Sequence, residues 1–198
     1  MSHLEELLTE YYEWLGHVVK CNVLVGKLEH GGYEMELDVV AYDPQTTTIL
    51  HLEPSLDALP WAKREARFAK KFDAGQRFIL PKLFPWLPAT TRIIRRAILV
   101  SAGSDRRTLA GAEVRTVDET IGEIKHAVSC KGIASRAAIS EHYPLLRTIQ
   151  FVTCGYYRLV EHRPPTTANS GMTEDAISEL LEDEKHAARA ERRAGHAR

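Results

Sequence analysis

Apolar and polar positions follow two different periods along the first half of the chain. Residues 2–16 place apolar side chains at helical spacing, and Ser2 followed by Glu5 forms the pattern of a capping box. This pattern predicts an N-terminal helix. Three extended runs follow, each rich in β-branched or alternating apolar residues and separated by Gly, Asp and Pro turn signals: residues 21–28, 33–42 and 46–52. We predict a strand for each run, and the third strand must end or lie open at Pro54.

A second helix is predicted over residues 58–74, because aromatic side chains repeat on one of its faces. Asp57 is the expected cap, Pro60 suits the first turn, and Gly75 is expected to end the helix. Five basic residues crowd this helix: Lys63, Arg64, Arg67, Lys70 and Lys71. Such a face is usually only solvated. Its position directly after a strand that ends in an acid makes it a candidate nucleic-acid-binding surface.

The remaining apolar segments complete the predicted fold. They are a central strand and three helical pieces, at residues 92–101, 118–129, 135–143 and 145–153. The predicted order is helix, strand, strand, strand, helix, strand, helix. This order is typical of a mixed α/β (α+β) fold in which helices flank a small mixed sheet.

The composition changes towards the C-terminus, which sets the predicted domain boundaries. Residues 1–162 form the predicted domain, and residues 163–172 read as a linker. Residues 173–198 are mostly charged residues and Ala, with a thin apolar stripe. We expect a surface helix or a partly disordered tail there, able to dock on a partner protein.

Composition and charge exclude several classes of protein. The formal net charge is -1, so the whole chain is not a general polyanion binder and local patches matter more. The three cysteines lie far apart, which leaves no CxxC metal site and no disulfide framework. A reducing cytoplasm is therefore the expected compartment. No apolar run approaches the ~18 residues that a membrane-spanning helix needs, so we expect no membrane partner.

Two acidic residues are the strongest candidates for chemistry. Asp38 lies inside an apolar strand, where a carboxylate is costly to desolvate unless it is paired, hydrogen-bonded or bound to a metal. Glu53 ends the next strand. A tight hairpin would not place the two residues opposite each other, whereas a longer loop over residues 43–47 would bring them closer. Two carboxylates at one strand end suit Mg²⁺ or Mn²⁺, which activates water and offsets charge on a phosphate.

Residues 5–101 resemble the PD-(D/E)XK, restriction-endonuclease-like superfamily. The resemblance is carried by a helix, a strand ending in ELDVVAY, a strand ending in an acid, and a basic helix. It implies a restriction-endonuclease-like core in which Asp38 and Glu53 match the two metal-binding acids. It also implies a helper acid from the first helix, for which Glu13 is the better candidate and Glu10 the other.

The chain departs from the family pattern at one important position. The family has a lysine two residues after the second acid, and this chain has Ser55 there. Serine cannot supply the fixed positive charge that orients water and stabilises the phosphate. We expect Lys71 or Arg67 of the second helix to stand in for the lysine. Asp57 is a further acid that could join the metal shell, as is Glu36, which alternation places on the same face as Asp38.

The resemblance implies a Mg²⁺-dependent endonuclease that acts on DNA as a homodimer. The alternative is a catalytically degenerate protein of the same fold that binds nucleic acid or a partner protein. His51 shares a strand face with Glu53 and is interpreted first as a packed strand histidine rather than a ligand.

Overall fold

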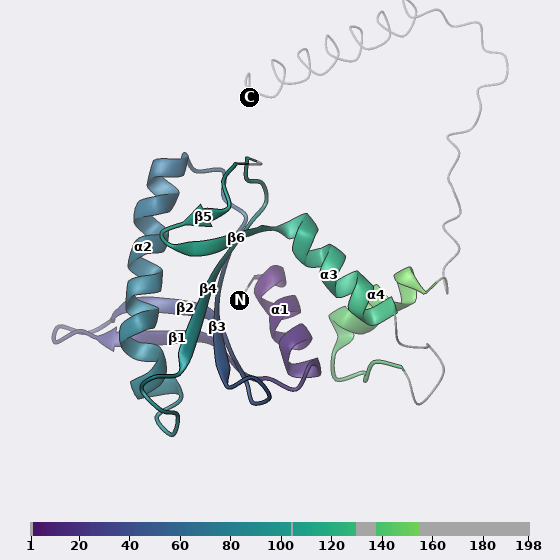
Figure 1. Ribbon diagram of the computed structural model, residues 1–198, viewed down its shortest axis with the longest axis horizontal. Coiled ribbons are helices and arrows are strands. Elements are labelled where there is room, and N and C mark those ends of the chain that lie inside the picture. Colours follow the sequence, from purple (N-terminus) through teal and green to yellow (C-terminus); the bar gives the residue numbers. More distant parts are fainter. Residues whose placement is uncertain (1, 104, 130–137, 155–198) are drawn as a thin grey trace, which may run out of the picture. The chain divides into compact units, whose positions relative to one another are not determined.

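The computed structural model describes residues 2–103, 105–129 and 138–154 of the 198 residues, all within one compact unit, Met1–Arg158. In chain order the described elements are α1 (His3–Trp14), β1 (Val18–Lys27), β2 (Tyr33–Asp43), β3 (Thr48–Ser55), α2 (Trp61–Phe78), the π-helix η1 (Ile79–Leu83), β4 (Arg92–Leu99), β5 (Thr108–Leu109), β6 (Ala112–Thr116), α3 (Val117–Ser129) and α4 (Pro144–Thr153) (Figure 1). The prediction of a mixed α/β fold is confirmed.

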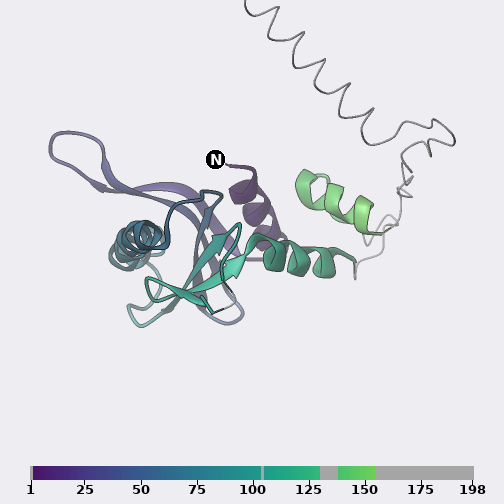
Figure 2. The same ribbon diagram turned by 90° about the horizontal axis from the view of Figure 1, so that it is seen from above.

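Six strands of the described part form one mixed sheet with the order β1-β2-β3-β4-β6-β5. The pairs β1–β2, β2–β3 and β5–β6 are antiparallel, whereas β3–β4 and β4–β6 are parallel. Helix α2 covers one face of this sheet, and α1, α3 and α4 lie on the other face (Figure 2). The central strand β3 therefore has a helix layer on each side.

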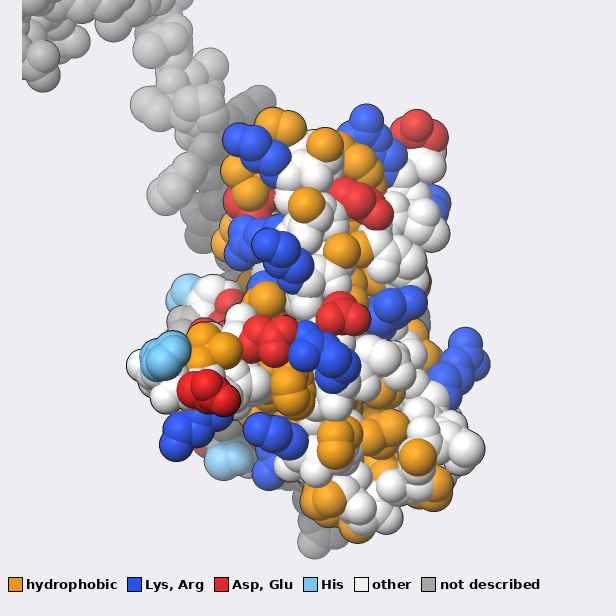
Figure 3. Space-filling view, turned by 90° about the vertical axis from the view of Figure 1, so that its left-hand side faces the viewer, with side chains coloured by type: hydrophobic (Ala, Val, Ile, Leu, Met, Phe, Trp, Pro, Cys, Tyr) orange, Lys and Arg blue, Asp and Glu red, His pale blue; other side chains and the backbone are white. Residues whose placement is uncertain are grey.

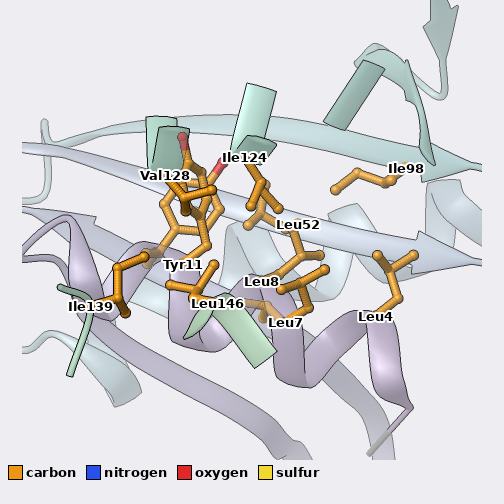
Figure 4. Close-up of a cluster of buried hydrophobic side chains, with 13 residues drawn as sticks. Leu4, Leu7, Leu8, Tyr11, Leu52, Ile98, Ile124, Val128, Ile139 and Leu146 are labelled. Carbon is orange, nitrogen blue, oxygen red and sulfur yellow. The ribbon is translucent and has the colours of Figure 1, made fainter. Parts of the chain in front are cut away.

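The core is divided between the two faces of the sheet. On one face, apolar residues of α1, α3 and α4 pack against the sheet through side chains such as Leu8, Leu52 and Ile124, each 0% exposed (Figure 4). On the other face, Phe68 and Phe72 of α2 are buried against β4 and β6. Burying side chains of this size contributes roughly 1.5–3 kcal/mol each before entropy is counted. The strands that carry the candidate acids are thus held rigidly from both sides.

The observed element order differs from the predicted one after β4. A short hairpin, β5–β6, lies between β4 and α3 where the sequence pattern predicted no strand. Strand β5 has only two residues, so it has too few positions to show an alternating pattern. Residues 138–143 are not helical, in contrast to the helix predicted over 135–143. The rest of that prediction, and the linker and tail at 163–198, lie outside the described residues.

Two predictions about helix α2 are corrected by the structure, and one about strand β3 is resolved. Gly75 does not end the helix, which continues to Phe78. Asp57 is not the cap: the N-cap residue is Pro60, and Asp57 binds basic side chains of the helix instead. Strand β3 continues through Pro54 to Ser55 because it stays paired with β4 over these residues. Its pairing with β2 on the other side ends at Leu52. Pro54 therefore lies where the strand is open, the second of the two expected outcomes.

Within the described residues, no helix is both long and apolar enough to cross a membrane. The helices instead bury one face each against the sheet, as amphipathic helices do.

Candidate active site

The pairing of β2 with β3 brings Asp38 and Glu53 together. The last pair in this ladder is Val39 with Leu52, so the next residue outward on each strand is Asp38 and Glu53, respectively. The register is set by a loop over residues 44–47, since Asp43 pairs with Thr48. The longer loop required by the prediction is therefore present. At this end the backbone N–H of Asp38 lies 3.4 Å from Glu53 Oε1.

Helix α2 supplies a lysine to the same point. Lys71 Nζ donates to Asp38 Oδ2 at 2.6 Å and also donates to Glu53 Oε2. The side chains of Lys71 and Asp38 are 12% and 13% exposed, and that of Glu53 is 0% exposed. One ammonium group thus joins two carboxylates that sit on neighbouring strands. Arg67, the other basic residue considered for this role, lies one turn earlier in the helix.

His51 holds the second oxygen of Glu53. Its Nε2 lies 2.8 Å from Glu53 Oε1, and both side chains are 0% exposed. A carboxylate only accepts hydrogen bonds, so with Glu53 ionised the proton must sit on Nε2. His51 Nδ1 is then the unprotonated nitrogen, and it has no hydrogen-bond partner among the described groups. The interpretation of His51 as a packed strand histidine is therefore incomplete, because the ring also orients Glu53.

Gly75 explains how a histidine ring fits under α2. A Cβ atom at this position would lie 2.3 Å from both Cε1 and Nδ1 of His51. Non-bonded contacts this short essentially never occur for a Cβ atom. The helix can therefore pass over the ring only because residue 75 has no side chain. The ring of Phe72 packs edge-on against His51 with a centroid distance of 5.1 Å. The glycine that was expected to end the helix instead makes room for the group beside Glu53.

Burial shapes the charge states of this cluster. Burial and the neighbouring Glu53 carboxylate raise the pKa of Asp38 to about 7, although Lys71 opposes the shift. Burial and the Lys71 charge lower the pKa of His51 to about 3, so the ring is neutral near pH 7. Burial alone would lower the pKa of Lys71, but Glu53 and Asp38 outweigh it and raise the pKa. Lys71 is accordingly a permanent cation at the centre of the site.

A second ionic cluster borders the first. Ser55 donates its hydroxyl to Asp57 Oδ2 at 2.6 Å, and Arg67 NH1 donates to the same oxygen at 2.7 Å. Arg64 is 7% exposed and donates to Asp57 and to the backbone oxygen of Ser101. Arg64 was predicted to bind nucleic acid, but its guanidinium is buried and used within the protein. Asp57 accepts from Ser55, Arg64 and Arg67, so these three groups hold its carboxylate in the structure.

The acids of α1 separate into a structural one and a remote one. Glu10 is 7% exposed and accepts from the backbone N–H groups of Leu145 and Leu146, so it caps α4. Glu13 lies in the last turn of α1. The first turn of this helix borders Ser55, so Glu13 is about two turns away from that end. The structure therefore brings neither of these two predicted helper acids to Asp38 and Glu53.

Glu5 of α1 borders Ser55, although the sequence pattern indicates it only as part of the capping box. It lines a pocket of about 260 Å³ together with Ser55 and Arg67. With its amide oriented so that the nitrogen donates, Asn22 lies 3.2 Å from Glu5 Oε2 and 3.2 Å from Glu36 Oε1. The sequence gives no direct signal for this, because the position of Glu5 depends on which end of α1 approaches the end of β3.

The exposed side of α2 is basic even though Arg64 is buried and does not contribute to it. Lys63, Arg67 and Lys70 are exposed, and among the described residues Lys63 and Lys70 have no ion-pair partner. Figure 3 views the molecule from the side on which α2 and the β1–β2 hairpin lie, and it shows basic side chains spread among acidic and apolar ones. The surface can contact phosphates, but it is not a uniformly positive field.

The carboxylates of Asp38 and Glu53 fit a magnesium ion in that both converge on one point. Mg²⁺ is commonly held by one or two carboxylates, with the remaining ligands coming from water and substrate phosphates. Here two carboxylates converge on a single atom, Lys71 Nζ, which is a cationic position. Across the described ranges, no group of three or more His, Cys, Asp and Glu side chains is arranged to hold a metal ion. An ion at this site would therefore rely on the pair alone and would require Lys71 to move aside.

Comparison with known proteins adds no further constraint on the site. No protein-family model and no curated protein sequence matches this chain. The functional argument therefore rests on the geometry described above.

Proposed function

We propose that this chain is a Mg²⁺-dependent endonuclease that hydrolyses phosphodiester bonds in DNA, built on a restriction-endonuclease-like core. The observation that carries the proposal is the position of Lys71, whose ammonium contacts both Asp38 and Glu53 at one end of the β2–β3 ladder. Two carboxylates that can hold a metal ion and a lysine beside them are groups that hydrolysis of a phosphodiester can use, once the ion displaces the ammonium from between the carboxylates. Their burial makes each charge interaction stronger than it would be in water.

Lys71 takes the role that the family pattern gives to the residue at position 55. Ser55 is on the same strand face as Glu53, but its hydroxyl is spent on Asp57. Lys71 reaches the acid pair from α2, the helix that follows β3. Its raised pKa keeps it charged at neutral pH, so it can stabilise the negative charge that develops on a phosphate under attack.

Asp38 and Glu53 share one task in this proposal, and His51 supports it. Asp38 and Glu53 would hold Mg²⁺, and the ion would supply an activated water and offset phosphate charge. His51 fixes one oxygen of Glu53, and the other oxygen, which accepts from Lys71, faces the site. Such support of a ligand by a neighbouring hydrogen bond is common at metal centres, where it fixes the ligand's orientation.

The order of elements supports the proposed core. Residues 3–99 run through one helix, three antiparallel strands, a second helix and a parallel strand. This is the arrangement on which the family resemblance rests. The extra hairpin β5–β6 lies after it, at the far edge of the sheet, so it leaves the arrangement of the acid pair unchanged.

The test is a plasmid-cleavage assay with Mg²⁺ or Mn²⁺ and with a chelator as blank. The wild-type protein is expected to nick or linearise plasmid DNA only with the ion. Asp38→Asn and Glu53→Gln should each reduce the rate by at least about 100-fold, which corresponds to roughly 2.7 kcal/mol of lost transition-state stabilisation. Asp118→Asn, an exposed change in the first turn of α3, is the matched control and should cleave like wild type. Cleavage that survives in both site variants would refute the proposal.

The rival function is a binding module of the same fold without hydrolysis. The specific observation in its favour is that the Lys71 ammonium already occupies the position between the two carboxylates, where a metal ion would bind. This function predicts DNA retention that does not depend on a divalent ion and no cleavage by any variant. The same assay, read beside a gel-shift measurement in chelator, separates the two.

A further inference from the structure

A pocket lies directly beside the acid–lysine cluster, between α2 and strand β2. Its volume is about 290 Å³, and its lining residues are Met35, Ala66, Arg67, Lys70 and Lys71. The four helix residues fall on one side of α2, because they are separated by one, four and five positions. Lys71 belongs both to this pocket and to the acid pair. A molecule seated here would therefore adjoin the reacting group.

The lining divides into a cationic part and an apolar part. Arg67, Lys70 and Lys71 provide positive charge, and Lys70 has no ion-pair partner among the described residues. Met35 of β2 and Ala66 of α2 provide an apolar surface beside that charge. A thioether side chain is adaptable and packs well against flat aromatic groups. Phosphate and a flat, weakly polar ring together are the parts of a nucleotide.

We propose that this pocket is a nucleotide subsite, which seats the sugar and base next to the phosphodiester at Lys71, with Met35 against the base. The inference rests on the proposed function and narrows its substrate contact to one place on the surface. It also gives the β1–β2 hairpin a role in substrate binding through Met35. If DNA instead bound to the whole basic face of α2, its affinity would not depend on the pocket. Changes inside and outside the pocket therefore distinguish the two modes of binding.

Filling the pocket tests its role in binding. Ala66 and Ala62 are both exposed on α2, and only Ala66 lines the pocket. The affinity of Ala66→Phe and of Ala62→Phe for a fluorescein-labelled 20-base-pair duplex is measured in chelator, where no cleavage occurs. We expect Ala66→Phe to weaken binding roughly tenfold and Ala62→Phe to change it less than about twofold. Equal effects of the two changes would overturn the subsite.

Charge removal gives a second, smaller perturbation in case the added ring disturbs the helix. Lys70→Ala removes a cation that lines the pocket, and Lys63→Ala removes one on the same helix outside it. The subsite predicts that only Lys70→Ala weakens binding strongly. Equal losses for the two would show a diffuse basic face instead and would overturn the subsite.

Methionine methyl NMR then identifies the ligand chemistry. With methyl-labelled methionine, thymidine monophosphate should move the Met35 signal upfield through the ring current of the base. Inorganic phosphate at the same concentration should leave that signal unshifted. A saturating shift with a Kd on the order of 1 mM is the expected strength for one nucleotide. An unmoved Met35 signal with thymidine monophosphate would contradict the assignment.

Failure of this inference can be told apart from failure of the proposed function. Cleavage of plasmid with equal binding by Ala66→Phe and Ala62→Phe would keep the hydrolase and remove the subsite. Selective loss of binding in Ala66→Phe without any cleavage by wild type would keep the subsite in a binding module. Absence of duplex binding by wild type would remove both.

Discussion

Replacing Gly75 with alanine is expected to destabilise the protein, although glycine-to-alanine changes inside helices usually stabilise. Alanine gains about 0.5–1 kcal/mol over glycine in a helix interior. At Gly75 the new Cβ would lie 2.3 Å from two atoms of the His51 ring, which is 0% exposed and packed against Phe72. Overpacking of this kind costs about 1–3 kcal/mol. Loss of the His51–Glu53 hydrogen bond adds about 1.5–3 kcal/mol, since one partner is charged.

The net effect should be a loss of about 1.5–5.5 kcal/mol in the free energy of unfolding after the helix gain is deducted. The assay is urea unfolding followed by circular dichroism, with the midpoint and slope compared between variants. Gly122→Ala in α3 is the matched control, because a Cβ there meets no atom within 4 Å. That control should gain about 0.5–1 kcal/mol from helix propensity alone.

A double-mutant cycle isolates the contact itself. If the cost of Gly75→Ala comes from the ring, it should shrink in a His51→Ala background, where the ring is absent. The reasoning is refuted if Gly75→Ala stabilises the protein as much as Gly122→Ala does. It is also refuted if the cost is the same with and without the ring of His51.

Three further predictions follow from the same contacts. Glu10→Gln should cost about 1 kcal/mol in urea unfolding through the weakened cap on α4, whereas Glu13→Gln should change stability by less than about 0.5 kcal/mol. Lys71→Met should lower the melting temperature at neutral pH, because it leaves two buried acids unpaired, and added Mg²⁺ should restore part of the loss if the pair binds the ion. Nitrogen NMR should show His51 protonated only on Nε2 and unchanged from pH 8 to pH 5, since its pKa is about 3, and a titration near pH 6.5 would contradict the buried pair.

The sequence supported the fold class and the two acids because each leaves a local signal. A carboxylate within an apolar strand, as at Asp38, is costly unless paired, so its presence indicates a partner. Strand β5 left no such signal, because two residues cannot display a period, whereas the alternation along Ala112–Thr116 of β6 is present in the sequence and was missed. The end of α2 was misjudged because Gly75 is a helix stop in most settings and here serves packing against His51.

Where the site depends on tertiary placement, the sequence reduces the candidate residues to a few but does not select one of them. Lys71 and Arg67 were equal candidates by helical spacing, and only the path of α2 over β3 separates them. The same limit applies to α1, where the acid facing the site depends on the direction in which the helix crosses the sheet. Glu5 therefore lies nearer to Ser55 than the favoured Glu13.

The most direct test of the central claim is to move the lysine. Plasmid cleavage with Mg²⁺ is measured for wild type, Lys71→Met and the double variant Lys71→Met/Ser55→Lys, which restores a lysine two residues after Glu53. If Lys71 supplies the positive charge to the acid pair, Lys71→Met should lose activity and the double variant should recover a measurable part of it. Cleavage by Lys71→Met at the wild-type rate would contradict this account of the site.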